Sequence, residues 1–390
     1  MTDFIPILRF AALSDVHYKD EPSVERERMA KALQIANREH LDALCVVGDF
    51  ANSGSEAQFK AFKQTLDEGL RSTTKRILSV ASHEFGGGPV GAYAKLRRYF
   101  GQAADVHEMI NGYHFISLSP SKGTQFDQEK REWAAAQLAL AAEDDPRRPI
   151  FFFQHPHVTG TVYGSIIWGE DELYPILMNY PQVINFSGHS HAPINDPRSI
   201  HQEYFTSLGC GTLSYFENDE FDKYYGTCPP APEGRQAAQM LIVEADAVGR
   251  VQITPYDILT DQPFPSAWKI PTPWNPASFQ YTNMKRRAAA LPPYFPPEAN
   301  LRVEGNILTF DQAKARQDYV NDYCVRIRHG DILVKQIALW SHYYVIPMPA
   351  TLSVPLDGLT PGKEYEIEIT ARGFWENESE NKLTGRFTAD

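Results

Sequence analysis

The sequence contains few cysteines, no basic cluster and no long apolar run. Its four cysteines, at positions 45, 210, 228 and 324, are scattered along the chain, and none belongs to a C-x-x-C pair. This spacing argues against a disulfide scaffold and against a zinc knuckle. It favours reduced thiols, as in a cytoplasmic protein.

The charge balance narrows the choice of partners. The formal net charge is −12, and no basic run resembles a phosphate-binding stripe, so we expect no nucleic-acid binding. An acidic protein still accepts an anionic substrate if bound cations dominate the local field. No segment approaches the roughly 20 apolar residues of a membrane span, and the N-terminus has neither a basic region nor a cleavage signal. We therefore expect a cytoplasmic location without a membrane span.

The length predicts more than one domain. Hydrophobic residues make up 43% and charged residues 22% of the 390 residues, as in an ordinary globular protein with a sizeable core. We predict a first domain over residues 1–257, a proline-rich connector over 258–297 that packs on it through Trp268 and Trp274, and a second domain over 298–390.

The first domain alternates strands and helices. Apolar runs predict strands at 7–13, 44–47, 77–80, 114–118, 150–153 and 183–186, and amphipathic spacing predicts helices at 25–39, 56–70 and 128–142. This alternation implies right-handed crossovers and a sheet with parallel strands. The second domain shows only short alternating segments, including one at 343–346, which predict a small β-sandwich.

Potential metal ligands follow the predicted strands of the first domain. They are Asp15 with His17, Asp49, His155, and His189 with His191. Loops at the carboxyl ends of strands converge on one edge of an open α/β sheet. A lone aspartate or histidine at a strand end is usually structural, but this whole series is hard to obtain by accident.

The series resembles the calcineurin-like metallophosphoesterase family. The resemblance is carried by Asp15-x-His17, Gly48-Asp49-x-x-Asn52, Ser82-His83-Glu84, His155 and Gly188-His189-x-His191. It implies a four-layer αββα sandwich with a dinuclear metal centre at the sheet edge. In that arrangement Asp15, His17 and His191 would hold one metal, and His155 and His189 the other. Asp49 would bridge the two metals and His83 would face the substrate.

The implied activity is hydrolysis of a phosphomonoester or phosphodiester. Two divalent cations would polarise the phosphoryl oxygens and ionise a bridging water into a hydroxide nucleophile. Imidazole ligands suit manganese, iron or zinc. His83 would protonate the departing oxygen or stabilise charge on the phosphoryl group. Glu84 is either a carboxylate that orients an imidazole or a solvated side chain.

One position departs from the family pattern. Ser82 stands where the family has an asparagine that ligates the second metal. The serine hydroxyl would ligate that metal directly, hold a ligating water, or leave the metal weakly bound. The alternative to a working hydrolase is therefore a catalytically weakened or inactive metal-binding protein.

Two further features of the first domain have open interpretations. His157 is either a substrate contact or a partly exposed loop residue. The aromatic loops 158–170 and 213–232 either roof the metal site or pack against the second domain.

The second domain resembles a fibronectin type III module. The resemblance is carried by Leu359-Thr360-Pro361-Gly362-Lys363-Glu364-Tyr365, with the leucine and tyrosine at a corner. We expect a small-molecule or headgroup phosphoester as substrate, and any homo-oligomer to use the C-terminal domain.

Overall fold

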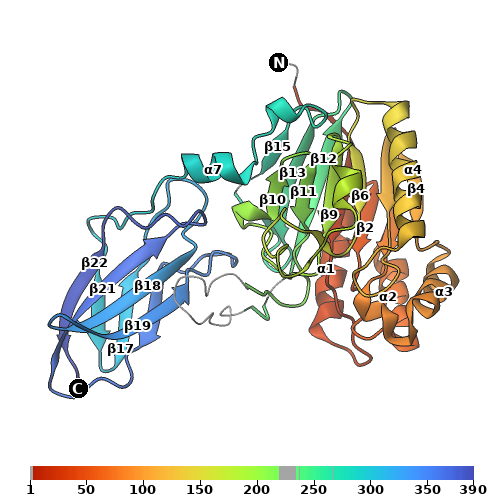
Figure 1. Ribbon diagram of the computed structural model, residues 1–390. Helices are drawn as coiled ribbons and strands as arrows, with labels where there is room; N and C mark the ends of the chain where they lie inside the picture. Colours follow the sequence, from red (N-terminus) through yellow and green to blue (C-terminus); the bar gives the residue numbers. More distant parts are fainter. Residues whose placement is uncertain (1–2, 219–233, 237, 266) are drawn as a thin grey trace. The chain divides into compact units, whose positions relative to one another are not determined.

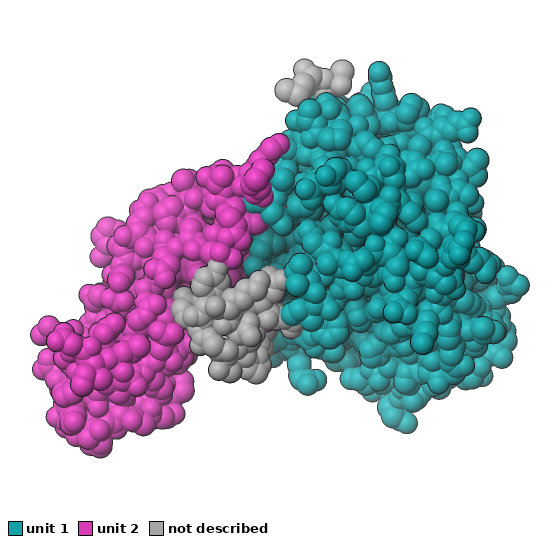
Figure 2. All heavy atoms as spheres, in the orientation of Figure 1, with its two compact units in different colours: residues 1–217, 233–283 teal, residues 218–232, 284–390 magenta. Residues whose placement is uncertain are grey.

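The computed structural model describes residues 3–218, 234–236, 238–265 and 267–390. The chain divides into two compact units, one of residues 1–217 and 233–283 and one of residues 218–232 and 284–390 (Figure 2). The domain boundaries predicted at residues 257 and 298 stay predictions. Each unit is described by itself below.

The first unit contains a mixed sheet with the order β14-β13-β12-β1-β2-β3, and β15 pairs with β13 (Figure 1). Strands β1 to β3 are parallel, whereas β12 pairs antiparallel with β1 and with β13. The bounds are β1 (Pro6–Leu13), β2 (Ala43–Val47), β3 (Lys75–Ser79), β12 (Gln239–Asp246), β13 (Val251–Asp257), β14 (Gln262–Pro263) and β15 (Trp268–Ile270).

A second mixed sheet has the order β10-β11-β9-β6-β5-β4, in which β5, β6, β9 and β11 are parallel. Its strands are β4 (Val106–Ile110), β5 (Tyr113–Ser117), β6 (Ile150–Phe153), β9 (Val183–Ser187), β10 (Ile200–Gln202) and β11 (Thr206–Gly209). A separate two-stranded ribbon pairs β7 (His157–Val158) with β8 (Gly169–Glu170).

The helices follow the predicted periodicity closely. They are α1 (Val24–Arg38), α2 (Glu56–Gly69), α3 (Pro89–Phe100), α4 (Gln128–Asp144) and α5 (Tyr174–Leu177), with 3-10 turns η1 (Ser82–Gly87) and η2 (Pro197–Ser199). Ser55 begins α2 with a reciprocal cap, because its hydroxyl accepts the N–H of Gln58 while the Gln58 side chain accepts the N–H of Ser55. None of the described helices is long and apolar enough to cross a membrane.

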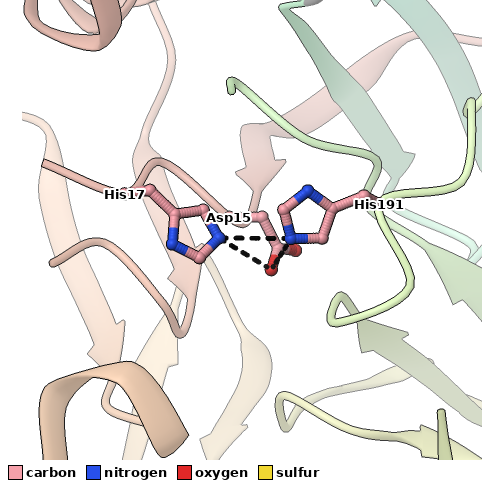
Figure 3. A group of neighbouring side chains, drawn as sticks. All are labelled: Asp15, His17 and His191. Atoms are coloured by element: carbon pink, nitrogen blue, oxygen red, sulfur yellow. Dashed lines mark hydrogen bonds and ion pairs between the residues drawn. The ribbon is translucent and has the colours of Figure 1, made fainter. Parts of the chain in front are cut away.

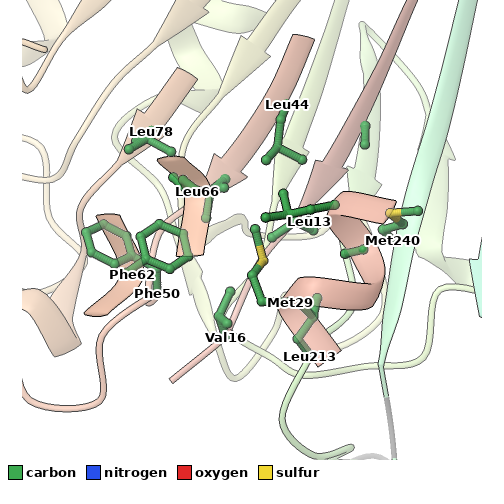
Figure 4. Close-up of a cluster of buried hydrophobic side chains, with 14 of the residues drawn as sticks. Leu13, Val16, Met29, Leu44, Phe50, Phe62, Leu66, Leu78, Leu213 and Met240 are labelled. Carbon is green, nitrogen blue, oxygen red and sulfur yellow. The ribbon is translucent and has the colours of Figure 1, made fainter. Parts of the chain in front are cut away.

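Three apolar cores divide the first unit into layers. One lies between the two sheets and is rich in phenylalanine, with Phe10 of β1 packed edge-on against Phe115 and Phe151 of the other sheet. A second lies between the first sheet and α1 to α3, and Figure 4 shows part of it, including Leu13, Met29 and Phe62. A third covers the outer face of the second sheet beneath α4 and α5. The predicted αββα sandwich is therefore confirmed.

The proline-rich segment is partly built into this unit. Trp268 of β15 is buried and pairs with Ile253 of β13. The 3-10 turn η3 (Pro276–Ser278) and the short helix α7 (Asn283–Ala289) follow. The strands β14 and β15 thus extend the first sheet, with Trp268 packed on it as expected.

The second unit is an all-β sandwich, as predicted. One sheet contains β16 (Leu301–Glu304), β17 (Ile307–Asp311) and β20 (Thr351–Pro355), and the other contains β18 (Asp322–His329), β19 (Ile332–Trp340), β21 (Glu364–Arg372) and β22 (Leu383–Thr388). The N–H of Thr360 donates to the Tyr365 hydroxyl at 2.9 Å, so Tyr365 holds the turn that precedes β21. The fibronectin type III resemblance itself stays a prediction.

The strand predicted at 343–346 is wrong. Those residues form a turn in which the N–H of Val345 donates to the carbonyl of His342, whose φ is 62°. Tyr343 and Tyr344 are adjacent and both buried, at 1% and 2% exposure. An extended strand would point two neighbouring side chains to opposite faces, so the aromatic content alone was misleading.

Candidate metal centre

The candidate site lies where five parallel strands end. Asp15 and His17 follow β1, Asp49 follows β2, Ser82 and His83 follow β3, His155 follows β6, and His189 and His191 follow β9. The first three strands belong to one sheet and the last two to the other. The site therefore spans the carboxyl-end edges of both sheets, which is where ligands bind in α/β proteins.

The first group of potential ligands consists of Asp15, His17 and His191 (Figure 3). The Nε2 atom of His191 lies 3.3 Å from Asp15 Oδ1 and 3.2 Å from His17 Nε2. The His17 Nε2 atom lies 3.7 Å from the same carboxylate oxygen. All three side chains are buried. Two ring nitrogens and one oxygen thus converge on a single point.

The hydrogen bonds around this group leave room for a cation. His191 Nδ1 lies 2.9 Å from the carbonyl oxygen of Tyr215, which only accepts, so this nitrogen carries the hydrogen. In the neutral ring the Nε2 lone pair then faces Asp15 and His17. Asp15 Oδ1 is buried and has no hydrogen-bond partner. One carboxylate oxygen and two ring nitrogens in a buried space are a donor set that fits a divalent metal.

The second group consists of Asp49, His155 and His189, whose potential ligand atoms lie within 4.8 Å of one another. His155 Nδ1 donates to the carbonyl of Val47 at 2.7 Å, which directs Nε2 toward Asp49 Oδ2 at 2.9 Å. That Nε2 atom is buried, and its contact with Asp49 lacks hydrogen-bond alignment. The same logic therefore applies to a second cation.

Burial and neighbouring charges shift the pKa values of the potential ligands, and for Asp15, Asp49 and His155 the two effects oppose each other. Burial alone would raise the pKa of both aspartates, but the nearby histidines outweigh it. His191 and His155 hold the pKa of Asp15 well below its usual range, and His155 lowers that of Asp49 to about 2. Against the effect of burial, Asp49 and Asp15 raise the pKa of His155 to about 10. Burial lowers the pKa of His189 to about 4, with His155 adding to the shift.

His83 lies between the two groups and the solvent. Its backbone N–H donates to Asp49 Oδ1 at 3.1 Å, and its Nδ1 donates to the carbonyl of Asn52 at 2.7 Å. These bonds aim Nε2 inward, 4.0 Å from Asp49 Oδ2, while the ring stacks edge-on against His17 with centroids 4.5 Å apart. The side chain is 42% exposed, so a substrate can reach it.

Ser82 opens the turn η1, directly before His83. It is half-buried and follows Ala81, whose N–H is held by Glu84 Oε2 at 2.8 Å. Its assignment as a metal ligand stays a prediction, as do the ligand roles of the other residues.

The structure corrects both readings of Glu84. The side chain is fully buried and orients no imidazole. Its two oxygens accept the backbone N–H groups of Asp49, Ala51 and Ala81, so it ties the loop after β2 to the loop after β3. Burial and the charge of Asp49 raise its pKa to about 8. Ala81 is a local partner, three residues away, but Asp49 and Ala51 lie 35 and 33 residues away, so no local sequence signal indicates the link between the two loops.

The backbone of the site is strained. Five potential ligands adopt the left-handed region, with φ between 50° and 72°: Asp15, His17, Asp49, His189 and His191. This conformation costs a non-glycine residue about 1–2 kcal/mol, and such strain is concentrated at functional sites. Gly48 has φ 82°, and a Cβ there would lie 2.7 Å from His155 Nδ1. The surrounding hydrogen bonds hold these loops in place.

His157 is neither exposed nor aimed at a substrate. It is buried, at 1% exposure, and its two ring nitrogens lie 2.7 Å from the hydroxyls of Ser187 and Ser190. Burial and the neighbouring His189 lower its pKa to about 3, so the ring is neutral. The sequence offered no sign of this, because the serine partners lie 30 and 33 residues away.

Aromatic side chains flank both groups. Tyr215 packs on His191 with ring centroids 4.2 Å apart, and Trp168 contacts His189 edge-on at 5.1 Å. Tyr163 instead packs under the guanidinium of Arg198. Tyr224 and Tyr225, in the aromatic loop 213–232, lie outside the described residues. Among the described residues, Trp168 of the first aromatic loop and Tyr215 of the second therefore border the metal groups.

Comparison with known proteins gives a family match. Residues 8–193 match the family model described as calcineurin-like phosphoesterase. Comparison with curated protein sequences finds no significant match.

Solved structures give distant likenesses. A dimetal phosphatase from Danio rerio is 11% identical, with a TM-score of 0.49, over 69% of this chain and 100% of that chain. A purple acid phosphatase from yellow lupin (Lupinus luteus) seeds is 13% identical, with a TM-score of 0.49, over 68% and 53%. GAP50 of Plasmodium, described as the anchor in the inner membrane complex, is 13% identical, with a TM-score of 0.49, over 68% and 89%.

Proposed function

We propose, from the premise that residues 8–193 form a calcineurin-like phosphoesterase domain, that this chain hydrolyses phosphomonoesters or phosphodiesters at a dinuclear metal centre. The observation that carries the proposal is the set of three overlapping acid–histidine groups at the strand ends, the third of which consists of His17, Asp49 and His83. The family implies a phosphoester-hydrolysing enzyme with two metals. The ligand assignment, the substrate and the mechanism are our proposals.

Asp15, His17 and His191 would hold one metal, and His155, His189 and Ser82 the other, with Asp49 between them. Two bound cations would polarise the phosphoryl oxygens and help ionise an attacking water. Imidazole nitrogens favour manganese, iron or zinc over calcium or magnesium. The carbonyls of Val47 and Tyr215 keep the Nε2 atoms of His155 and His191 directed into the site.

His83 would act on the departing oxygen. Its Nδ1–H stays bonded to the Asn52 carbonyl in both protonation states, so the ring keeps its orientation while Nε2 gains or loses a proton. The protonated ring donates its Nε2–H to the leaving oxygen or to a phosphoryl oxygen. The Asp49 carboxylate, 4.0 Å away, stabilises the positive charge that this ring carries before the transfer.

Metal analysis and hydrolysis assays test this proposal together. The purified protein is expected to contain about two transition-metal ions per chain and to hydrolyse an aryl phosphate or a bis-aryl phosphate diester with added manganese. His83→Ala should keep the metal content and lower turnover by about 10²–10⁴-fold. Loss of metal in this variant would assign His83 as a ligand instead.

Asp49→Ala provides the complementary test of the metal centre. It should remove both metals, because the Asp49 carboxylate groups with His155 and His189 on one side and with His17 and His83 on the other. Wild-type protein that contains no transition metal and shows no turnover would contradict the whole proposal. A screen of nucleotides, cyclic nucleotides, phosphosugars and phospholipid headgroups would then narrow the substrate.

A second candidate function is metal binding with little or no turnover. It rests on Ser82, whose short hydroxyl stands at the position of a ligating amide in the resembling family. In the described part of the second unit we find no comparable acid–histidine group, so that unit offers no alternative centre. Its use in homo-oligomer formation, like the cytoplasmic location, stays a prediction.

A further inference from the structure

We propose that His157 is a positioning residue that holds Ser190, and through it the loop that carries His189 and His191, in the geometry that both metal groups require. The inference rests on the proposed metallophosphoesterase function and deepens it. His157 belongs to the ribbon strand β7 and is no member of either metal group. Ser190 is the single residue between the two histidine ligands.

The hydrogen bonds around His157 have a defined direction. The Ser187 hydroxyl donates its one hydrogen to the carbonyl of Leu208 at 3.2 Å, so its oxygen accepts from His157 Nδ1 at 2.7 Å. The other nitrogen of the neutral ring then has a lone pair. It accepts the hydroxyl hydrogen of Ser190, also at 2.7 Å. The chain of donors thus runs from Ser190 through His157 to Ser187 and the β11 backbone.

This chain of bonds ends in a strained loop. His189 and His191, on either side of Ser190, have φ of 72° and 53°. The Ser190 oxygen also accepts the N–H of Ala192 at 3.3 Å, while the N–H of His189 donates to Asp15 Oδ2 at 3.0 Å. Fixing the Ser190 side chain therefore fixes the middle of the loop, and the two imidazoles on either side keep their directions.

The surroundings leave His157 and Ser190 little freedom. Gly164 lies so close that a Cβ on it would be 2.6 Å from the Ser190 Cβ. The N–H of His157 donates to the carbonyl of Trp168 at 3.2 Å, which anchors the ribbon next to His189. The side chains of His157 and Ser190 are buried, at 1% and 3% exposure.

The test uses the two halves of the imidazole separately. His157→Gln places an amide oxygen near the Nε2 position, where it can accept from Ser190. His157→Asn places its amide near the Nδ1 position, where it can serve Ser187 only. Ser190→Ala removes the hydroxyl and keeps the ring. Manganese binding to the metal-free full-length proteins would be measured by calorimetry, with the visible spectrum of the cobalt-loaded protein as a second readout.

We expect His157→Asn and Ser190→Ala to bind manganese about 10–100-fold more weakly and to alter the cobalt spectrum. The double variant should lose no more than either single variant, because both break the same bond. His157→Gln should stay near the wild type. His114→Asn serves as the control, because His114 is a buried histidine of the same second sheet that bonds His107 and Asp144 instead.

The outcomes separate this inference from the proposed function. Wild-type protein that takes up no manganese or cobalt contradicts the metal centre itself. Normal wild-type binding with unchanged affinity in Ser190→Ala and His157→Asn overturns only the role of His157. If His157→Asn fails to fold, Ser190→Ala decides, since it removes one hydroxyl from a loop. Equal losses in the Asn and Gln variants would also overturn the proposal, because packing alone would then explain them.

Discussion

At the scale of single residues, the site depends on the second hydrogen bond of each imidazole. His155 and His191 each donate Nδ1–H to a backbone carbonyl, and His83 does the same with Asn52. Each ring therefore presents Nε2 to the interior of the site. A carbonyl is present in every residue, so sequence reasoning could find the histidines but not what orients them.

Ser82 is the residue whose role a substitution would decide most directly. Ser82→Asn should supply the longer amide ligand and tighten manganese binding at the second site about tenfold, with a matching rise in turnover at low metal concentration. Metal titration at limiting manganese would measure this. Ser72→Asn, at an exposed turn in the same domain, is the control. If affinity stays the same, Ser82 does not contact the second metal.

At the scale of elements, two glycines allow the strand-end loops to approach one another. A Cβ on Gly188 would lie 1.9 Å from Ser14 Oγ and 2.6 Å from Asp15 Oδ2, so the loop after β9 packs directly on the loop after β1. Gly48 makes the corresponding approach to His155. The two sheets therefore meet at the site through backbone without side chains.

Gly188→Ala should displace these loops. We expect a loss of about 1–3 kcal/mol in unfolding free energy, together with weaker metal binding, because the new methyl group overlaps Ser14 and Asp15. Gly87→Ala is a matched control in a neighbouring loop, since a Cβ at Gly87 would meet nothing within 4 Å. Chemical unfolding and metal titration of both variants would check this. If Gly188→Ala and Gly87→Ala have the same unfolding free energy and metal affinity, the loop after β9 accommodates the added methyl group.

The ribbon strand β8 gives the protein a specific pH response. Burial, with help from the Glu172 carboxylate, raises the pKa of Glu170 from 4.5 to about 9. Between these values the folded protein holds a proton that the unfolded chain releases. The contribution of Glu170 to stability is therefore fully present below about pH 4.5 and is lost as the pH rises toward 9.

Glu170→Gln should remove this pH dependence. One amide oxygen can still accept the N–H groups of Glu172 and Leu173, both of which bond the same Glu170 oxygen. Relative to the wild type, the variant should gain about 1–3 kcal/mol between pH 5.5 and 8.5. Unfolding of the metal-free proteins at both pH values would measure the difference. Glu143→Gln, exposed on α4, should show no such gain.

At the scale of the whole molecule, each unit has its own hydrophobic core. The first unit contains three clusters around its two sheets, and the second contains one cluster between its sheets. The potential metal ligands lie in the first unit alone among the described residues. The geometry of the proposed hydrolytic site should therefore depend on the three hydrophobic clusters of the first unit and not on the cluster of the second.

Ile367→Ala tests this division, because Ile367 is buried in the core of the second unit. Removing its side chain should destabilise that unit by about 2–5 kcal/mol and leave metal content and hydrolysis unchanged. Ile184→Ala removes a side chain from the core between the two sheets of the first unit, so it should lower both metal content and hydrolysis. Calorimetry with and without manganese would separate the two transitions. Loss of activity in Ile367→Ala at a temperature where the first unit is folded would contradict the division.

Much of the fold and the residue types of the site could be predicted from the sequence. The periodicity of α1, α2 and α4 and the apolar runs of β1, β2, β6 and β9 are local properties, so they were visible without a structure. The turn at 343–346 and the pairing of β15 with β13 were not, because burial and sheet pairing depend on distant segments.

The order of residues alone indicates that aspartates and histidines stand at the ends of alternating strands, and it indicates the family that this order resembles. The folded structure was needed to show that these residues form overlapping groups, that Glu84 joins two loops, and that the His157 ring contacts the Ser190 hydroxyl. The reason is physical. Helix and strand periodicity is a property of near neighbours in the chain, whereas burial, hydrogen-bond partners and pKa values here depend on groups that folding brings from 30 to 174 residues away.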